Sequence, residues 1–329
     1  MLKNNYNNLK NTIMKIKHLS LLALIAIFLI NSCKEREEII KVGYIPIAEC
    51  VQLYVAKDLG YFEKYNVNVE LISLAGGAKI LNALNSGSVD VGFSNVVSLV
   101  LHKTQGSKFY SVFGSSIETK FNQNHALLIN KEIKTEDIKT SLTGSKISIN
   151  TYKNIEELMV RKYLNQNGVN WDDVEKIAIP FPRMLPLLES GDITVSSIVE
   201  PFISIASLDT SGKIQYFANH YLSTTPKTLV ATYVSSENAI TKKRNGLIGF
   251  VKAMSDATDY IRNNESEARE IIGNYTKIPK ELLPKIGLSE FAEELDLNLL
   301  QMVIDDMVRF EYVKPSKLPE ISSFKYNFD

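Results

Sequence analysis

Two short stretches hold residues that could contact a ligand through exposed backbone amides. Gly76-Gly77 precedes apolar residues at helical spacing, and Ser94-Asn95 follows the alternating, strand-like run 89–93. The first amides of a helix have no partner inside it, so they can bind an anion or another hydrogen-bond acceptor. The order loop, helix, strand, loop therefore predicts two ligand-facing turns. A tight turn at the glycines and a helix cap at Ser94-Asn95 are the structural alternatives.

A related pattern returns further along the chain. The stretch 188–195 repeats 84–91 at an offset of 104, and 146–149 repeats 41–44 at an offset of 105. In each copy a strand is followed by a helix that ends at Ser-Gly and leads into a second strand. Several elements repeated in one order predict an α/β fold made of two similar lobes. We expect a ligand in the cleft between them.

Composition and charge exclude some classes of protein. The 329 residues are 45% hydrophobic, which allows one large or two modest cores. Four of the 37 basic residues, all lysines, precede residue 33, and no acid does, so the rest carries 33 basic and 37 acidic residues. This balance gives no basic surface for nucleic acid.

The N-terminal segment has the features of an export signal. Lys15 and Lys17 precede the apolar run 19–30, which is shorter than the roughly 20 residues that span a bilayer. The end of this run, Leu29-Ile30-Asn31-Ser32-Cys33, resembles the bacterial lipobox, in which the cysteine is lipidated and becomes the new N-terminus. We expect a lipid anchor at Cys33 on the extracytoplasmic side of the membrane, in the periplasm or at the cell surface. A plain signal peptide or an uncleaved anchor is the alternative.

The predicted boundaries follow from this signal. The signal peptide takes residues 1–32, and the charged run 33–38 forms a solvated tether. Met14 is an alternative start, because residues 1–13 add nothing to the signal. Cys50 has no partner once Cys33 is lipidated, so no disulfide is expected.

The opening of the mature chain carries a more specific pattern. Strands are expected over 39–45 and 67–74, with an amphipathic helix over 51–61 between them. The most specific motifs are Val42-Gly43-Tyr44-Ile45-Pro46, 53–62, 67–71, Gly76-Gly77, Ser86-Gly87, Val89-Asp90-Val91 and Ile198-Val199-Glu200-Pro201-Phe202. Together they resemble the nitrate/sulfonate/taurine-type solute-binding proteins of bacterial ABC importers, a family that also includes binders and makers of the thiamine pyrimidine.

The resemblance implies the type 2 periplasmic-binding fold, in which two α/β lobes are joined by two crossings and close over a ligand. Lobe one would take residues 39–130 and lobe two 131–222. Residues 223–329 would return to lobe one as a strand and C-terminal helices. The implied partners are a small-molecule ligand and the permease and ATPase subunits of an ABC importer, without a cofactor. We expect a monomer.

The ends of the predicted strands and helices, together with the resemblance, select candidate ligand-binding residues. Thr151 resembles the family's helix cap that faces the ligand from lobe two, with capping alone as the alternative. Glu200 is either a ligand contact or part of a hinge. The full set is Pro46, Glu49, Gln52, Gly76, Gly77, Ser94, Asn95, Thr151, Tyr152 and Glu200.

No residues have catalytic or metal-binding spacing. His102, His125 and His220 are scattered, and neither an HExxH pattern nor a pair of closely spaced cysteines is present. We therefore expect a binding protein and not an enzyme. One alternative is an enzyme on the same fold, of the pyrimidine-precursor synthase or menaquinone-pathway lyase type. The export signal argues against it, because those enzymes work in the cytoplasm. A lipid-anchored ligand sensor is the other alternative.

The expected ligand combines a polar or anionic end with a planar part. Helix N-termini favour an anion or acceptor, while Tyr44, Tyr152, Phe181 and Phe202 lie near strand ends, where rings could stack on a heterocycle. Glu49 opposes a bare anion but can accept hydrogen bonds from an amino-bearing ring. A thiamine-precursor-like pyrimidine is the leading candidate, and a sulfonate is the second.

Overall fold

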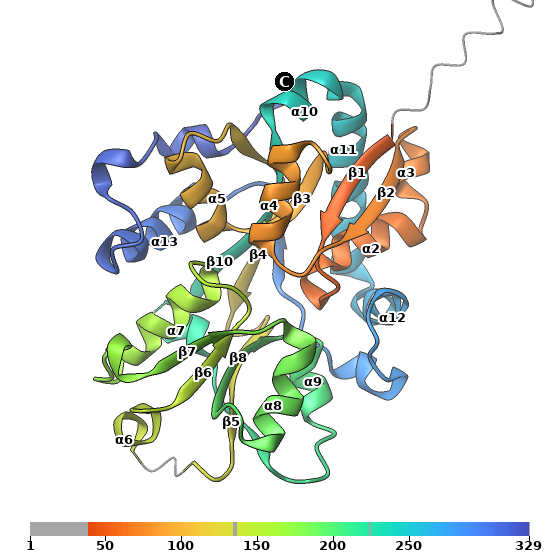
Figure 1. The fold of residues 1–329 in the computed structure, drawn as a ribbon. Helices are drawn as coiled ribbons and strands as arrows, with labels where there is room; N and C mark the ends of the chain where they lie inside the picture. The colour runs from red at the N-terminus through yellow and green to blue at the C-terminus, as the bar shows by residue number, and fades with distance from the viewer. Residues whose placement is uncertain (1–38, 134–136, 224, 329) are drawn as a thin grey trace, which may run out of the picture. The chain divides into compact units, whose positions relative to one another are not determined.

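The computed structural model describes residues 39–133, 137–223 and 225–328. The predicted signal peptide, Cys33 and the charged tether lie outside these residues. The described chain forms two mixed β-sheets with helices packed on them (Figure 1). None of the helices in the described ranges combines the length and apolar character that crossing a membrane would need.

The first sheet has six strands in the order β11-β4-β10-β3-β1-β2. Strand β1 runs parallel to β2 and β3, while β10 is antiparallel to β3 and β4. Eight consecutive residues of β10 are buried, as expected of a central strand covered on both faces. The strands are β1 Ile39–Tyr44, β2 Asn68–Ser73, β3 Val91–Asn95, β4 Phe109–Thr119, β10 Lys227–Ser236 and β11 Glu290–Ala292.

The second sheet has five strands in the order β7-β6-β8-β5-β9. They are β5 His125–Asn130, β6 Lys146–Ile149, β7 Glu175–Ala178, β8 Val195–Val199 and β9 Ile214–Ala218. Strand β5 pairs with β8 and β9, so the chain crosses to this sheet between β4 and β5 and not after residue 130. It returns between β9 and β10.

The internal repeat of the sequence is present in the pairing of the strands. In the first sheet Val42 of β1 aligns with Val91 of β3, and in the second Ile147 of β6 aligns with Val195 of β8. These are equivalent residues under the offsets of 105 and 104. The predicted α/β fold with two similar lobes is therefore confirmed.

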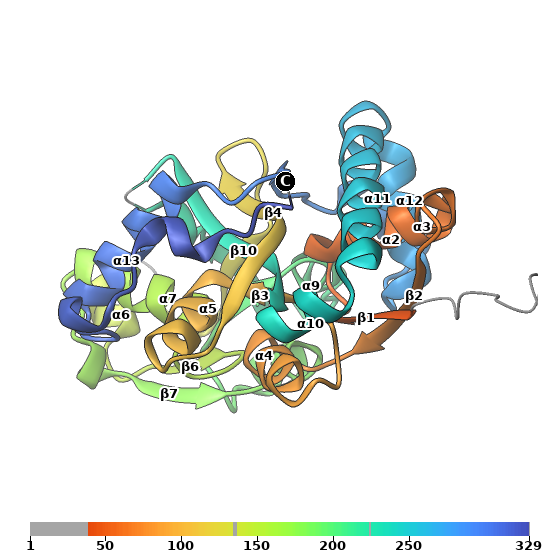
Figure 2. The same ribbon diagram turned by 90° about the horizontal axis from the view of Figure 1, so that it is seen from above.

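Helices cover both faces of the sheets (Figure 2). In the first lobe α11 and α12 pack on α2, with Phe250, Met254 and Ala257 of α11 fully buried. The helices are α2 Val51–Asp58, α3 Tyr61–Lys64, α4 Gly77–Ser86, α5 Val96–Thr104, α6 Ile138–Leu142, α7 Ile155–Gln166, α8 Met184–Ser190, α9 Phe202–Ala206, α10 Glu237–Lys242, α11 Arg244–Asn263, α12 Glu265–Tyr275 and α13 Leu297–Arg309.

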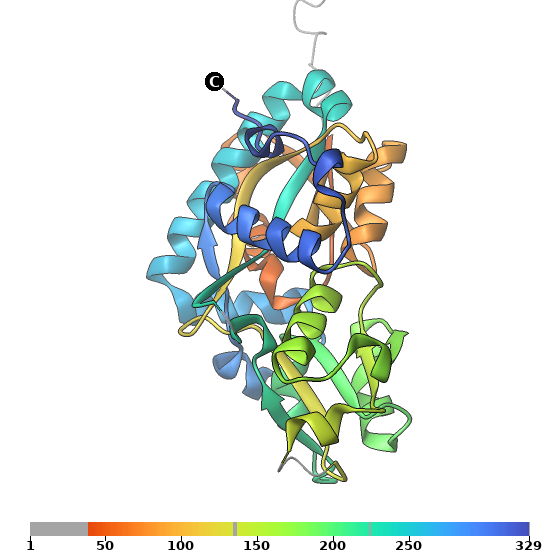
Figure 3. The ribbon, with the colours of Figure 1, turned by 90° about the vertical axis from the view of Figure 1, so that its left-hand side faces the viewer.

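Helix α7 of the second lobe packs against α13 of the first (Figure 3). Lys162 Nζ lies 2.5 Å from Asp306 Oδ2, and both side chains are largely buried. The Tyr312 hydroxyl donates to Glu157 Oε1 at 2.6 Å. These contacts hold the two lobes together beside the two crossings.

Candidate functional site

A pocket lies where the two lobes face each other. The first lobe contributes the loop after β1, the start of α4 and the end of β3, and the second contributes the start of β5, the end of β6 and the start of α7. The cavity has a volume of about 30 Å³, which holds a water molecule but not a ring. A ring-sized ligand would therefore have to enter while the lobes are apart. The lining residues are Ile45, Ile47, Glu49, Gly77, Phe93, Asn95, His125, Asn150, Asn154, Ile155, Glu156, Phe181, Val230 and Ala231.

Glycine at the start of α4 is required by close packing on the pocket wall. A Cβ atom at Gly77 would lie 2.8 Å from both Ser94 Oγ and Asn95 Nδ2. Asn95 caps α5, and its Oδ1 accepts from the Ser98 amide at 2.9 Å, so its Nδ2 atom is the one that faces Gly77. The first amides of α4 and the Asn95 side chain thus bring donors to one side of the pocket.

Two buried hydroxyls beside this wall have no hydrogen-bond partner within the described ranges. They are Ser94 Oγ in the first lobe and Thr151 Oγ1 in the second. The Thr151 methyl lies 3.4 Å from the Cβ position of Gly76, which places Thr151 across from the glycine pair. An unpaired buried hydroxyl costs roughly 1–3 kcal/mol, which a ligand that bonds to it would recover. These groups can bind an anionic or acceptor-rich end of a ligand.

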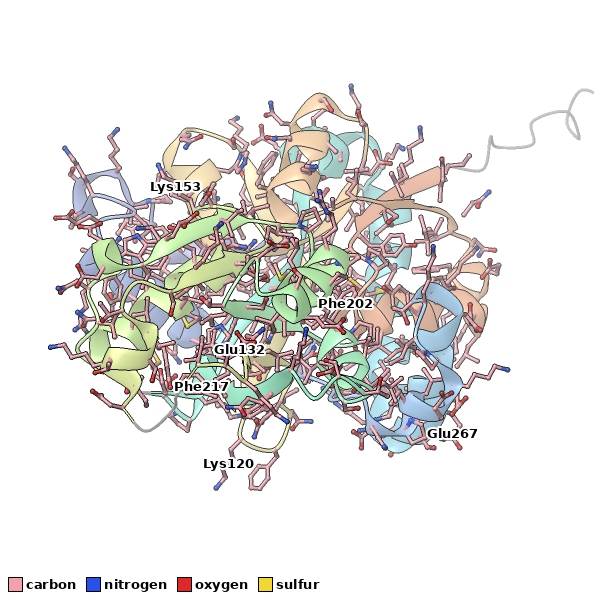
Figure 4. All side chains as sticks on the ribbon, turned by 60° about the horizontal axis from the view of Figure 1, so that its bottom comes forward. Lys120, Glu132, Lys153, Phe202, Phe217 and Glu267 are labelled. Carbon is pink, nitrogen blue, oxygen red and sulfur yellow. The ribbon has the colours of Figure 1, made fainter. Side chains whose placement is uncertain are left out.

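A buried cluster of carboxyl groups around His125 also borders the pocket. His125 Nδ1 lies 3.0 Å from Glu118 Oε2, and His125 Nε2 lies 3.6 Å from Glu49 Oε2. Glu49 Oε1 also accepts from the Ser116 hydroxyl at 2.5 Å. Lys120, two residues after Glu118, instead extends away from the rest of the chain (Figure 4). The inward side chains of this crossing therefore form a fixed ionic cluster next to the pocket.

The protonation states of His125 and the nearby glutamates follow from their burial and from these neighbours. Burial opposes the charged imidazolium of His125, but the Glu49 and Glu118 carboxylates outweigh it and raise the pKa of His125 to about 9. Burial raises the pKa of Glu156 to about 8, against the opposing effects of the Asn150 amide and His125. Burial likewise raises the pKa of Glu49. At neutral pH His125 is a cation and Glu156 is a neutral acid.

The structure brings some of the ten predicted site residues together at this pocket. Glu49, Gly77 and Asn95 line it. Gly76, Ser94 and Thr151 pack directly behind or across from this wall. Pro46 stands in the chain between two lining residues, Ile45 and Ile47.

The other three predicted residues do not line the pocket. Gln52 is buried within the first lobe and donates to Thr258 Oγ1 at 2.6 Å. Tyr152 is 55% exposed, and its hydroxyl donates to the Lys176 carbonyl. The Glu200 carboxylate accepts from Ser204 in its own lobe and from the Gly287 amide in the other, which is an arrangement suited to a hinge.

Two of the aromatic residues considered as stacking partners lie near the pocket. Phe181 lines it and stacks on Phe202, with ring centroids 6.0 Å apart. Phe202 itself lies in α9 on the second lobe (Figure 4). Tyr44 packs edge-on against Tyr54. Of the four rings, Phe181 is the one that lines this pocket.

The sequence did not single out the residues at the centre of the cluster. Glu118 lies near the end of a long strand, and Glu156 lies in the first turn of a helix, where acidic residues are common for other reasons. His125 was one of several scattered histidines. Burial in the structure is what marks these residues. Glu118, His125 and Glu156 are each at most 5% exposed, and a buried ionisable group needs a partner or has a function.

Comparison with known proteins identifies the family. The model of the NMT1-like family matches residues 34–274. Nitrate import ATP-binding protein NrtC of Synechocystis sp. is 23% identical over 300 residues, covering 85% of this chain and 43% of that protein. The chain thus spans less than half of this relative, and 37% of the bicarbonate transport ATP-binding protein CmpC.

Two further similarities cover most of both chains. A protein of Haemophilus influenzae named for thiamine biosynthesis is 24% identical over 307 residues, with 92% of this chain and 88% of that protein covered. The periplasmic aliphatic sulphonate binding protein SsuA from Escherichia coli has a TM-score of 0.69 at 17% identity, covering 88% of this chain and 92% of that one. The structural similarity to SsuA confirms the periplasmic-binding fold. The family match extends over most of the sequence, and the chain belongs to the NMT1-like family.

Proposed function

We propose that this protein is an extracytoplasmic solute-binding protein that captures a small organic molecule between its lobes and delivers it to an ABC importer. The observation that carries the proposal is the pocket between the lobes, where Gly77 and Asn95 of one lobe face Asn150 and Glu156 of the other. A ligand that touches both sides holds the lobes together, which is how such proteins present a closed form to a permease. The family membership and the importer names among its relatives support this role.

The pocket favours a ligand with two unlike ends. The amides of α4 and the unpaired hydroxyls of Ser94 and Thr151 suit an anionic or acceptor-rich end. The carboxyl groups of Glu49 and Glu156 suit an amino-bearing end, and the Phe181 ring also lines the pocket. A thiamine-precursor-like pyrimidine fits this pattern better than nitrate or an aliphatic sulfonate, although relatives carry the names of both anions.

The proposal includes attachment to the membrane. A lipid on Cys33, followed by the tether 34–38, would hold the folded part near a permease. The protein would act as a monomer with its permease and ATPase subunits as partners, without a cofactor. In this role it binds its solute and catalyses no reaction.

Thermal shift and small-angle scattering on the processed chain test the proposal together. The panel contains 4-aminopyrimidine, thiamine-pathway pyrimidines, taurine, an alkanesulfonate, nitrate and an aromatic carboxylate. A true ligand at a hundredfold excess over its Kd stabilises the folded state by about 2.7 kcal/mol. It should also reduce the radius of gyration, because it joins the two lobes. Stabilisation without compaction, or no stabilisation by any compound in the panel, contradicts the proposed function.

A further inference from the structure

We infer that closure of the lobes is linked to a proton: a buried carboxyl cluster at their boundary takes up one proton at Glu156 when the lobes close, so acid favours the closed form and alkali the open form. The carboxyl cluster consists of Glu49, Glu118, His125 and Glu156. The inference rests on the movement of the lobes that the proposed function requires, and it concerns the regulation of that movement, whatever the ligand is.

The carboxyl cluster draws its members from both lobes. Glu49 of η1 (Ala48–Cys50) and Glu118 near the end of β4 belong to the first lobe. His125 begins β5 and Glu156 lies in the first turn of α7, both in the second lobe. Each of the four is at most 5% exposed. Because Glu49 and Glu156 line the pocket between the lobes, parting the lobes exposes both carboxyl groups to water.

The charges of the closed cluster do not balance. Three carboxylates would accompany a single histidine cation, which leaves two negative charges without a partner when every group is ionised. The pocket of about 30 Å³ holds too little water to solvate them. Burial of an unpaired charge is costly, and such a group takes up a proton instead. The closed form therefore favours a proton on one of the three carboxyl groups.

Hydrogen bonds identify the carboxyl group that takes the proton. Glu118 accepts from the His125 ring and from the backbone amides of Asn124 and His125. Glu49 faces the second ring nitrogen of His125 at 3.6 Å and accepts from the Ser116 hydroxyl. Glu156 accepts from the neutral Asn150 amide at 2.7 Å. Since Glu118 and Glu49 share the histidine cation, Glu156 has the weakest support for a negative charge.

The titratable groups that face Glu156 do not supply a second cation. Glu49 of η1 repels a charge on Glu156, and His125 of β5 attracts it. Tyr221 of η4 (His220–Leu222) is a neutral phenol that stacks on His125. The adjacent Glu157 accepts from the Tyr312 hydroxyl and the Lys153 amide. Burial and the repulsion from Glu49 outweigh the Asn150 amide and His125, and they raise the pKa of Glu156 to about 8.

Cations on the helices that border the pocket are engaged or exposed. Lys162 of α7 pairs with Asp306, and Arg161 donates to the Phe310 carbonyl. Lys79 of α4 and Arg183 of η3 (Phe181–Arg183) are exposed. These side chains therefore leave the charge of the carboxyl cluster unchanged.

Parting of the lobes reverses the protonation of Glu156. Water then solvates its carboxylate, and its pKa falls from about 8 toward the ordinary value of 4.5. Closure is thus fully supported below the open-form pKa and loses this support as the pH rises through about 8. The closed-to-open ratio should fall by up to about tenfold per pH unit between these values. His125 contributes little, because Glu118 holds its ring and its backbone amide across the crossing itself.

A ligand and the proton would act together. Both favour the closed form, so each raises the affinity of the protein for the other. Solute capture would then be strengthened in an acidic envelope and weakened in an alkaline one.

Small-angle scattering of the ligand-free processed chain between pH 6 and pH 9 tests the inference. The radius of gyration of wild type should be smaller at pH 6 than at pH 9. Glu156→Gln should keep the smaller radius throughout, because a neutral amide replaces the protonated carboxyl. Glu49→Gln should move the compaction to lower pH, since one of the carboxylates that drives proton uptake is removed.

A matched control separates the carboxyl cluster from general effects of pH. Glu132 of the second lobe is an exposed carboxyl (Figure 4), and Glu132→Gln should compact with acid as wild type does. Circular dichroism at each pH checks that every variant is folded.

The outcomes distinguish this inference from the proposed function. A wild-type radius that is constant from pH 6 to pH 9, equal acid compaction in wild type and Glu156→Gln, or a Glu156→Gln variant that stays expanded overturns the proton link. The proposed function then depends on the ligand panel alone. Compaction of wild type by acid, with Glu156→Gln compact at every pH, supports the link even if no compound of the panel compacts the protein, a result that would contradict the proposed function.

Discussion

His125 Nδ1 lies 3.0 Å from Oε2 of Glu118, and this buried pair joins the two lobes at their crossings. Glu118 belongs to the first sheet and His125 to the second. Glu118 Oε1 also accepts from Asn219 Nδ2 at 2.7 Å, and Asn219 lies in the segment that returns to the first sheet. One carboxylate therefore fixes both crossings and sets the position of the histidine beside the pocket.

Replacing Glu118 by alanine should strongly destabilise the protein. The substitution leaves His125 buried without its closest anion, and breaking a buried pair in this way costs roughly 3–5 kcal/mol. Urea unfolding measures the change. Glu290→Ala is the matched control, because Glu290 forms a half-exposed pair with Lys227. It should lower the free energy of unfolding by less than about 1 kcal/mol. Equal losses in the two variants would contradict a structural role for the His125–Glu118 pair.

Stability should fall as the pH rises from 7 to 9. The pKa of His125 is raised from 6.5 to about 9, so its contribution is full below the unfolded value and is lost as the pH passes the folded value. Glu156, raised from 4.5 to about 8, acts in the same direction because its folded form also retains a proton. Urea unfolding at several pH values measures the slope. Glu156→Gln should reduce the slope between pH 7 and 8, and an unchanged slope would contradict the assigned protonation of Glu156.

Gly77→Ala should impair ligand binding at the start of α4. The added Cβ atom would lie 2.8 Å from Ser94 Oγ and Asn95 Nδ2, so these polar groups must shift. Overpacking of this kind costs roughly 1–3 kcal/mol of stability, and affinity should fall as well because the same groups face the ligand. Lys79→Ala, on the exposed side of the same helix, is the control and should change neither quantity. Full affinity in Gly77→Ala would exclude this wall from the binding site.

Cys33→Ser should release the protein from the membrane. Lipid chains on Cys33 would place wild type in the detergent phase, whereas the variant should remain soluble or unprocessed. Cys50→Ser is the matched control, because Cys50 is a buried free cysteine inside the first lobe. It should partition like wild type. The same soluble distribution and processed N-terminus in wild type and Cys33→Ser would rule out the lipid anchor.

The sequence alone determined the features that depend on local chemistry. The glycine pair before α4, the Ser-Gly ends of α4 and α8 and the alternation of β3 are visible in short windows, because turns and periodic burial are local properties. Gly87 and Gly191 both adopt the left-handed conformation at these helix ends, with φ of 73° and 83°. The repeat of these windows was enough to predict two lobes and the position of the donor-rich wall.

The tertiary structure alone decided the carboxyl side of the pocket. Glu49, Glu118, His125 and Glu156 come from four separate elements, and their distances depend on where the chain crosses between the sheets. The sequence placed β5 in the first lobe, but its pairing with β8 and β9 puts His125 at the lobe boundary. Strand pairing is a contact between distant residues, and local periodicity carries no information about the partner. For the same reason Tyr152, which follows a strand as a pocket residue would, turns outward to Lys176.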